Sequence, residues 1–231
     1  MKFHDFSPFY RSNEGIKPKV SGDRLLDNPL VADLQSGASF KFDGANDKVE
    51  VGDVTILDGA TSMTAECWFK MGTPSAEQVI FAKAYTDYVF EIRCLTTGKA
   101  AIRMRSDTGG SASVAPWPLT GNMTISDNQW KNVIITWDGS TVSLYVDGVL
   151  DVTGTLNGGG LKNTPDLLGF GGEISSSGLV VNDFEGEIRQ GRIHNRALSA
   201  DEVRAAYNGQ AVPYEYVGAS QTELVTNGNM E

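Results

Sequence analysis

The hydrophobic and polar positions between Asp127 and Leu150 predict three strands joined by tight turns. Residues 130–137 (WKNVIITW) are rich in β-branched and aromatic side chains, which is typical of a buried strand. Asp-Gly pairs at 138–139 and 147–148 separate this run from two further apolar runs. Asp-Gly between apolar runs is a strong hairpin signal, because glycine tolerates positive φ without steric cost. We therefore expect a meander of three antiparallel strands.

Similar patterns continue on both sides of this meander. Residues 40–42 and 49–51 alternate apolar and polar side chains, as half-buried strands do. Further strands are expected at residues 63–70, 79–83, 88–95, 100–105, 167–171 and 184–194. Loops are expected at residues 106–113, 115–118, 156–160 and 173–178. Ser199 and Glu202 form a capping-box pattern, which predicts a short helix that ends near Gly209.

Three motifs lie in a fixed order along the chain. Residues 39–51 read SFKFDGANDKVEV, residues 130–150 read WKNVIITWDGSTVSLYVDGVL, and residues 184–199 hold FEGEI followed by RIHNRALS. Together they resemble the opening strand pair, central signature and closing strand of laminin G-like (LamG) domains in the concanavalin A-like lectin/glucanase superfamily. The resemblance covers about residues 38–209. It implies an all-β fold, a two-sheet antiparallel jelly-roll sandwich with one short C-terminal helix.

The resemblance leaves both ends of the chain outside the domain. Residues 1–37 are expected to form an extended N-terminal arm, and residues 38–209 the LamG-like domain. Residues 210–231 are expected to form a C-terminal tail or linker. Phe3, Phe6, Phe9 and Tyr10 make the arm too apolar for a typical disordered tail. This favours an arm that orders against a partner or a neighbouring subunit over a floppy leader. Residues 223–231 resemble the first strand of jelly-roll carbohydrate-binding modules, as a vestige or as the start of a second module.

Length and charge narrow the class of protein. A chain of 231 residues accommodates one large all-β domain with extensions, and its 26 glycines suit many tight turns. The net charge of −10 argues against nucleic-acid partners and anionic membrane surfaces, which select basic patches. No apolar run is long enough for membrane insertion, and the N-terminus lacks the apolar core of a signal peptide.

The two cysteines, Cys67 and Cys94, each lie in an apolar run that predicts a strand. They could form a disulfide between neighbouring strands, or stay as two buried free thiols. We favour free thiols, because no secretory feature indicates an oxidising compartment.

Candidate catalytic groups are sparse. The two histidines, His4 and His194, do not complete a Ser-His-Asp triad. Asp183, Glu185 and Glu187 are spaced to lie on one face of a strand, and paired carboxylates serve retaining glycosidases. In LamG-like domains, however, acidic residues on this closing strand commonly face solvent. We therefore expect a non-catalytic protein and rank a glycoside hydrolase last.

The sequence offers one candidate sugar site. Flanking prolines hold Trp117 in a loop, and lectins stack aromatic rings on sugars. Tyr85, Asp87 and Tyr88 on another loop could assist. The alternative for Trp117 is a plug at the edge of the core, and the sequence supports both equally.

The resemblance also implies a structural calcium ion (Ca2+) where the first strand pair meets the last strand. The matching positions are Asp43, Asn46 and Asp183, and calcium prefers hard oxygen ligands on an irregular turn. Arg189 stands where the family often has an acid, so it could remove a ligand or replace the metal through an ion pair with Asp43. The alternative is a polar turn in which Asp43 caps its own backbone.

These expectations define a binding or structural module. LamG-like domains occur in phage virion proteins, so we expect a tail, fibre or capsid-decorating protein of the virion that binds host-surface glycans. Its other partners would be virion subunits, or a second copy of itself, through the N-terminal arm. The alternative is a secreted bacterial adhesin that binds carbohydrate at the cell surface.

Overall fold

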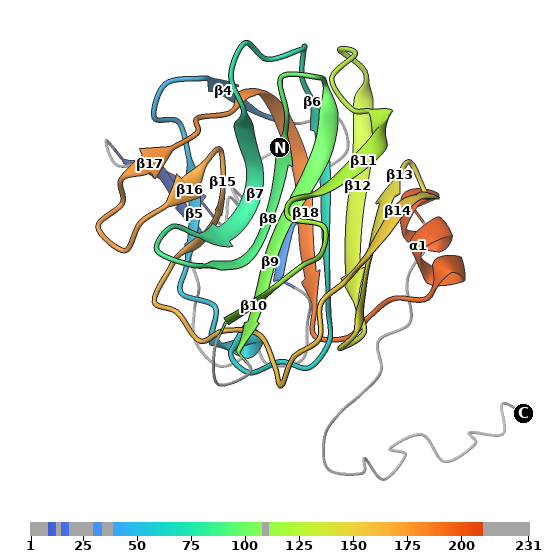
Figure 1. Cartoon of the computed structure of the whole chain (residues 1–231). Helices are drawn as coiled ribbons and strands as arrows, with labels where there is room; N and C mark the ends of the chain where they lie inside the picture. Colours follow the sequence, from blue (N-terminus) through green and yellow to red (C-terminus); the bar gives the residue numbers. More distant parts are fainter. Residues whose placement is uncertain (1–8, 13–14, 19–29, 34–38, 108–110, 210–231) are drawn as a thin grey trace, which may run out of the picture.

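Two large β-sheets stack face to face and enclose the hydrophobic core (Figure 1). The computed structural model describes residues 9–12, 15–18, 30–33, 39–107 and 111–209. Both sheets are built mainly from antiparallel neighbours, and one short helix follows the last strand. This arrangement confirms the predicted jelly-roll sandwich.

The first sheet has nine strands. Its neighbours run in the order β1 (Phe9–Ser12), β2 (Gly15–Pro18), β5 (Val49–Gly52), β15 (Leu168–Phe170), β7 (Gln78–Ala84), β8 (Tyr88–Cys94), β9 (Lys99–Asp107) and β10 (Ser111–Ser113), and β11 (Leu119–Thr124) also pairs with β9. Strand β2 runs parallel to β5. A separate hairpin consists of β16 (Glu173–Ile174) and β17 (Val180–Val181).

The second sheet has seven strands and contains the predicted meander. Its order is β14 (Val149–Thr155), β13 (Thr141–Val146), β12 (Trp130–Trp137), β6 (Met63–Lys70), β18 (Glu185–His194) and β3 (Leu30–Asp33), and β4 (Phe40–Asp43) also pairs with β18. Strands β12, β13 and β14 are consecutive antiparallel neighbours, which confirms the meander. A short 3-10 helix spans Thr55–Leu57.

Helix α1 (Ala200–Tyr207) covers part of the outer face of the seven-stranded sheet (Figure 1). Ser199 caps its first turn and Glu202 completes the capping box, as the sequence predicts. Tyr207 stacks on Trp68 of β6 with ring centroids 5.6 Å apart. Within the described part of the chain, no helix has the length and apolar character needed to cross a membrane.

Short strands replace two of the predicted loops. Strand β10 lies within residues 106–113 and β16 within residues 173–178, so these loop predictions were wrong in part. Runs of two or three residues are too short for alternation to be visible. Strand β11 was not predicted, because its sequence LTGNMT holds few residues that favour strands.

The described parts of the predicted arm are strands of the two sheets. Strand β3 pairs with β18, and β2 pairs with both β1 and β5. Phe9 and Tyr10 begin β1, whereas Phe3 and Phe6 lie outside the described residues, as does the tail at 210–231. Contact of the arm with another chain stays a prediction.

The two cysteines lie on opposite sheets and are both free and fully buried. Cys67 belongs to β6 and Cys94 to β8. The structure therefore confirms two thiols and excludes a disulfide between neighbouring strands.

Candidate functional site

Two arginines and two aromatic residues meet on the outer face of the nine-stranded sheet. In β9, Ile102 and Met104 point into the core, so the alternate residues Arg103 and Arg105 point outward. Tyr88 begins the neighbouring strand β8, and Trp117 lies in the loop before β11. We call Tyr88, Arg103, Arg105 and Trp117 the aromatic–arginine cluster.

The cluster is held by ring and cation–π contacts. The rings of Tyr88 and Trp117 meet edge to face, with centroids 5.5 Å apart. The guanidinium carbon of Arg103 lies 5.4 Å from the Tyr88 centroid and 5.9 Å from that of Trp117. The corresponding distances for Arg105 are 5.3 and 5.2 Å. Each arginine therefore contacts both rings, which keeps the cationic groups beside an aromatic surface.

Trp117 keeps a substantial part of its side chain in solvent. It is 39% exposed, although tryptophan is usually well buried in folded proteins. Because its ring is in contact with Tyr88 and yet remains accessible, the side chain can offer a surface to a ligand.

Asp87 closes one side of the cluster. Its carboxylate accepts a hydrogen bond of 2.9 Å from Nη1 of Arg105 and pairs with the ammonium of Lys162. Burial opposes ionisation, but the hydrogen bonds from Lys162 and Arg105 hold the pKa of this carboxyl below its usual value. Asp87 thus stays charged and anchors Arg105.

The loop that carries Asp87 is held in place by a buried carboxylate. Asp166 is almost fully buried, and its carboxylate accepts hydrogen bonds from the backbone N–H groups of Thr86 and Asp87. Tyr85 lies in the same turn, where its N–H donates to the carbonyl oxygen of Asp87. The structure thus brings three of the predicted residues, Trp117, Tyr88 and Asp87, into one contact network and places Tyr85 beside it.

Sequence reasoning missed the two arginines. The signal was present in the alternation of residues 100–105 (AAIRMR), which predicts that Arg103 and Arg105 share a face. What the alternation could not give is the pairing of β8 with β9, which sets these arginines beside Tyr88.

A buried charge network adjoins the cluster. Arg93 of β8 pairs with Glu91 on its own strand, with Glu77 and with Glu173 of the β16–β17 hairpin. Glu91 faces Arg103 across the β8–β9 ladder. Burial raises the pKa of Glu91 to about 7, although the charge of Arg93 opposes the shift. This network fastens the hairpin over the outer face of the sheet.

The predicted calcium residues do approach one another. The N–H of Asn46 donates to Oδ1 of Asp183 at 3.0 Å, and the N–H of Ala45 donates to Oδ1 of Asp43 at 2.9 Å. These contacts fit the alternative of a self-capped polar turn. Among the described residues, no group of three acidic, histidine or cysteine side chains is arranged to hold a metal. A calcium ion here stays a prediction from the resemblance.

Arg189 does not pair with Asp43, and that alternative was wrong. Its guanidinium carbon lies 4.1 Å from the ring centroid of Trp68 and 4.8 Å from that of Trp130. A register shift in β18 between Ile188 and Gln190 accompanies this placement.

Two of the acidic residues near the closing strand make separate contacts. Asp183 accepts from the backbone of Asn46, whereas Glu187 accepts from the Ser39 hydroxyl at 2.7 Å and pairs with Lys70 at 3.5 Å. His194 is buried on the same strand, as expected for a packed residue.

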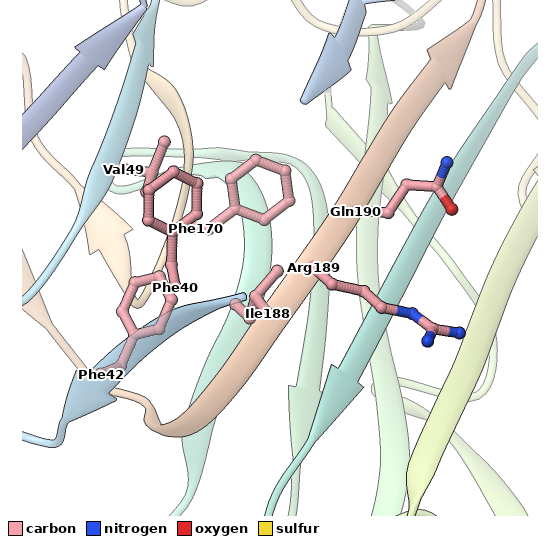
Figure 2. A pocket seen from close by; sticks show the side chains of 7 residues that line it. All are labelled: Phe40, Phe42, Val49, Phe170, Ile188, Arg189 and Gln190. Atoms are coloured by element: carbon pink, nitrogen blue, oxygen red, sulfur yellow. The ribbon is translucent and has the colours of Figure 1, made fainter. Parts of the chain in front are cut away.

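A small apolar pocket lies between β4, β5, β15 and β18 (Figure 2). It is lined by Phe40, Phe42, Val49, Phe170, Ile188, Arg189 and Gln190. Figure 2 shows that the side chains of Arg189 and Gln190 point away from the phenylalanines. The remaining lining offers few polar groups for a sugar, so the aromatic–arginine cluster is the better candidate site.

The two stacked antiparallel sheets define a jelly-roll sandwich. The family model described as the concanavalin A-like lectin/glucanases superfamily matches residues 43–204, so the chain belongs to this superfamily. No curated protein sequence matches the chain.

Solved structures share this fold at low sequence identity. The CBM40 of the Ruminococcus gnavus IT-sialidase bound to α2,3-sialyllactose is 18% identical, with a TM-score of 0.56, over 77% of this chain and 97% of that one. The binding domain of Paraclostridial Mosquitocidal Protein 1 is 16% identical, with a TM-score of 0.60, over 87% of this chain and 51% of that one. A structure of botulinum neurotoxin type C, whose cell entry depends on two ganglioside molecules, is 15% identical, with a TM-score of 0.57, over 79% of this chain and 45% of that one.

Proposed function

We propose that this domain is a non-catalytic glycan-binding module and that its site is the aromatic–arginine cluster. The observation that carries the proposal is the exposed ring of Trp117, held beside Tyr88 and two guanidinium groups. An aromatic face stacks on the apolar face of a sugar ring, while nearby charged groups bind its hydroxyls. The sialyllactose bound by the CBM40 relative is consistent with such a role for this fold.

The biological setting is a proposal of its own. We propose that the module belongs to a phage virion and recognises host-surface glycans, with a secreted adhesin as the alternative. Purified virions probed with an antibody against this chain test the first setting. Labelling of the particle supports it, and labelling only of bacterial surfaces supports the adhesin.

Replacing Trp117 with alanine tests the glycan site. We expect the Trp117→Ala variant to bind its glycan about tenfold more weakly, since one lost aromatic contact is worth ~1.5 kcal/mol. A glycan array would identify a ligand for the parent protein, and calorimetry would then measure the dissociation constants.

The matched control is Leu150→Ala, which removes an exposed apolar side chain from the seven-stranded sheet. It should leave glycan affinity and the melting temperature unchanged. Equal affinities for the parent protein and the Trp117→Ala variant would show that the sugar binds elsewhere.

A further inference from the structure

We infer that the aromatic–arginine cluster selects glycans that carry a carboxylate, and that Arg103 binds this anionic group. This inference rests on the proposed glycan-binding function. It adds the chemical class of the ligand and the residue that recognises it.

Arg103 has unused hydrogen-bond donors. It donates no hydrogen bond to any residue that the structure describes, and its Nε is buried without a partner there. The nearest carboxylate oxygen is Oε2 of Glu77 at 3.9 Å, and that oxygen already pairs with Arg93. A guanidinium carries five N–H donors in a planar fork, so Arg103 is equipped for a ligand that accepts several of them.

The position of Arg103 is fixed before a ligand arrives. Its guanidinium lies beside the rings of Tyr88 and Trp117, and the residue is roughly three-quarters buried, with 23% of its side chain exposed. A prearranged group loses little conformational entropy when it binds. The same contact places the guanidinium next to Trp117, so one sugar residue could stack on the ring and reach Arg103 with its acid.

The acids near Arg103 are engaged by other cations. Asp87 is engaged by Arg105 and Lys162, and Glu77 is shared with Arg93. The cross-strand neighbour of Arg103 is Glu91, which is fully buried and holds a proton at mildly acidic pH. With Glu91 uncharged, the nearby carboxylates of Glu77, Asp87 and Glu173 are each engaged by another cation, so Arg103 has no carboxylate of its own within hydrogen-bond distance among the described residues.

This geometry favours a carboxylate over a neutral hydroxyl. A carboxylate accepts two parallel N–H bonds from one guanidinium, whereas a single hydroxyl cannot match the fork. Neutral sugars would use the aromatic surface alone and leave the accessible donors of Arg103 without a charged partner.

The test compares acid and neutral forms of the same glycan. An array of neutral, uronate-bearing and sialate-bearing glycans is probed with the full chain at pH 6, and the strongest acidic ligand is then titrated beside its methyl ester. We expect array signals only from carboxylated glycans and at least a tenfold loss of affinity for the ester, which keeps both carboxyl oxygens, adds one methyl group and removes the charge.

Variants of Arg103 assign the residue. Arg103→Gln should lose at least tenfold in affinity for the acid and nothing for the ester, and Arg103→Lys should recover part of the loss. Arg204→Gln, which changes an exposed arginine on α1, is the matched control and should bind as the parent does. Unchanged melting temperatures establish that the variants fold.

Three other outcomes would overturn the inference. Equal affinity for acid and ester with a loss on Trp117→Ala refutes the inference and leaves the proposed function standing. Selective acid binding that Arg103→Gln does not change refutes the role of Arg103. Failure of the folded parent protein to bind any glycan refutes the proposed function and the inference with it.

Discussion

Two buried ionisable side chains, one in each sheet, should give stability opposite dependences on pH. Burial raises the pKa of Glu91 to about 7, against the opposing charge of Arg93. Burial, together with the charges of Arg196 and Arg192, lowers the pKa of His194 to about 4. Relative to the unfolded chain, the folded protein therefore holds an extra proton on Glu91 and lacks one on His194 in the weakly acidic range.

The sign of each contribution follows from proton linkage. Glu91 has a higher pKa in the folded state than its ordinary value of 4.5, so its contribution to the free energy of unfolding falls as pH rises from 4.5 to about 7. His194 has a lower pKa in the folded state than its ordinary value of 6.5, so its contribution to the free energy of unfolding rises with pH between about 4 and 6.5. We expect Glu91→Gln to make stability increase with pH between 4.5 and 6.5, and His194→Gln to make it decrease there.

Urea denaturation of the parent protein and of both variants at a series of pH values measures these slopes. Two variants that keep the slope of the parent would show that neither side chain governs the pH dependence.

At the scale of single residues, the sequence predicts chemistry where a residue type is distinctive. Trp117 was identified because its flanking prolines exclude a core strand, and Tyr85, Asp87 and Tyr88 were added as residues of a second loop. The arginines of β9 were missed because an exposed arginine in a strand is common. The pairing of β8 with β9, in which Glu91 lies opposite Arg103, is what places these arginines beside Tyr88. The register of β8 against β9 depends on strands that are distant in the sequence, so it cannot be predicted from the sequence of either strand alone.

At the scale of elements, the β16–β17 hairpin is held by charge contacts as well as by the buried apolar side chains of Ile174 and Val180. It has two residues in each strand, and Glu173 reaches Arg93 of β8 at 3.1 Å. Asn182 donates to the same Glu173 carboxylate at 2.8 Å. The Arg93 network therefore adds a polar attachment to the apolar contacts that hold the hairpin.

Replacing Arg93 with methionine should therefore destabilise the domain by about 3–5 kcal/mol, because buried carboxylates lose their counter-charge. Chemical denaturation measures this loss. Arg204→Met is the matched control, since Arg204 and its partner Asp201 are exposed and the substitution should leave stability unchanged. A small loss for Arg93→Met would mean that the carboxyl groups take up protons and compensate.

Long elements were predicted well, and short ones were not. Strands β6 and β12 match their predicted bounds, because eight residues of apolar sequence leave a clear pattern. The capping box likewise predicted the start of α1. Strand β10 pairs with the longer β9, and β16 and β17 pair with each other. Their own sequences are too short to show the alternation that would predict a strand.

At the scale of the whole molecule, the two sheets share one core. The largest cluster of buried residues includes Cys67 and Phe69 from the seven-stranded sheet, and Phe90 and Cys94 from the nine-stranded sheet. Neither inner face can reach water unless the other face is uncovered as well. We therefore expect the sheets to unfold together in one transition.

The two buried thiols can report the rate at which each sheet opens. Burial raises the pKa of Cys94 to about 12 and raises that of Cys67 well above its usual value, so neither thiol reacts while it is enclosed. Cys67→Ala and Cys94→Ala each leave one reporter, on opposite sides of the sandwich. A thiol reagent in large excess should label both variants at the same rate, once small differences in their stability are taken into account. If one cysteine were labelled much faster than the other, its sheet would open independently. The two sheets would then unfold at different rates and not in one transition.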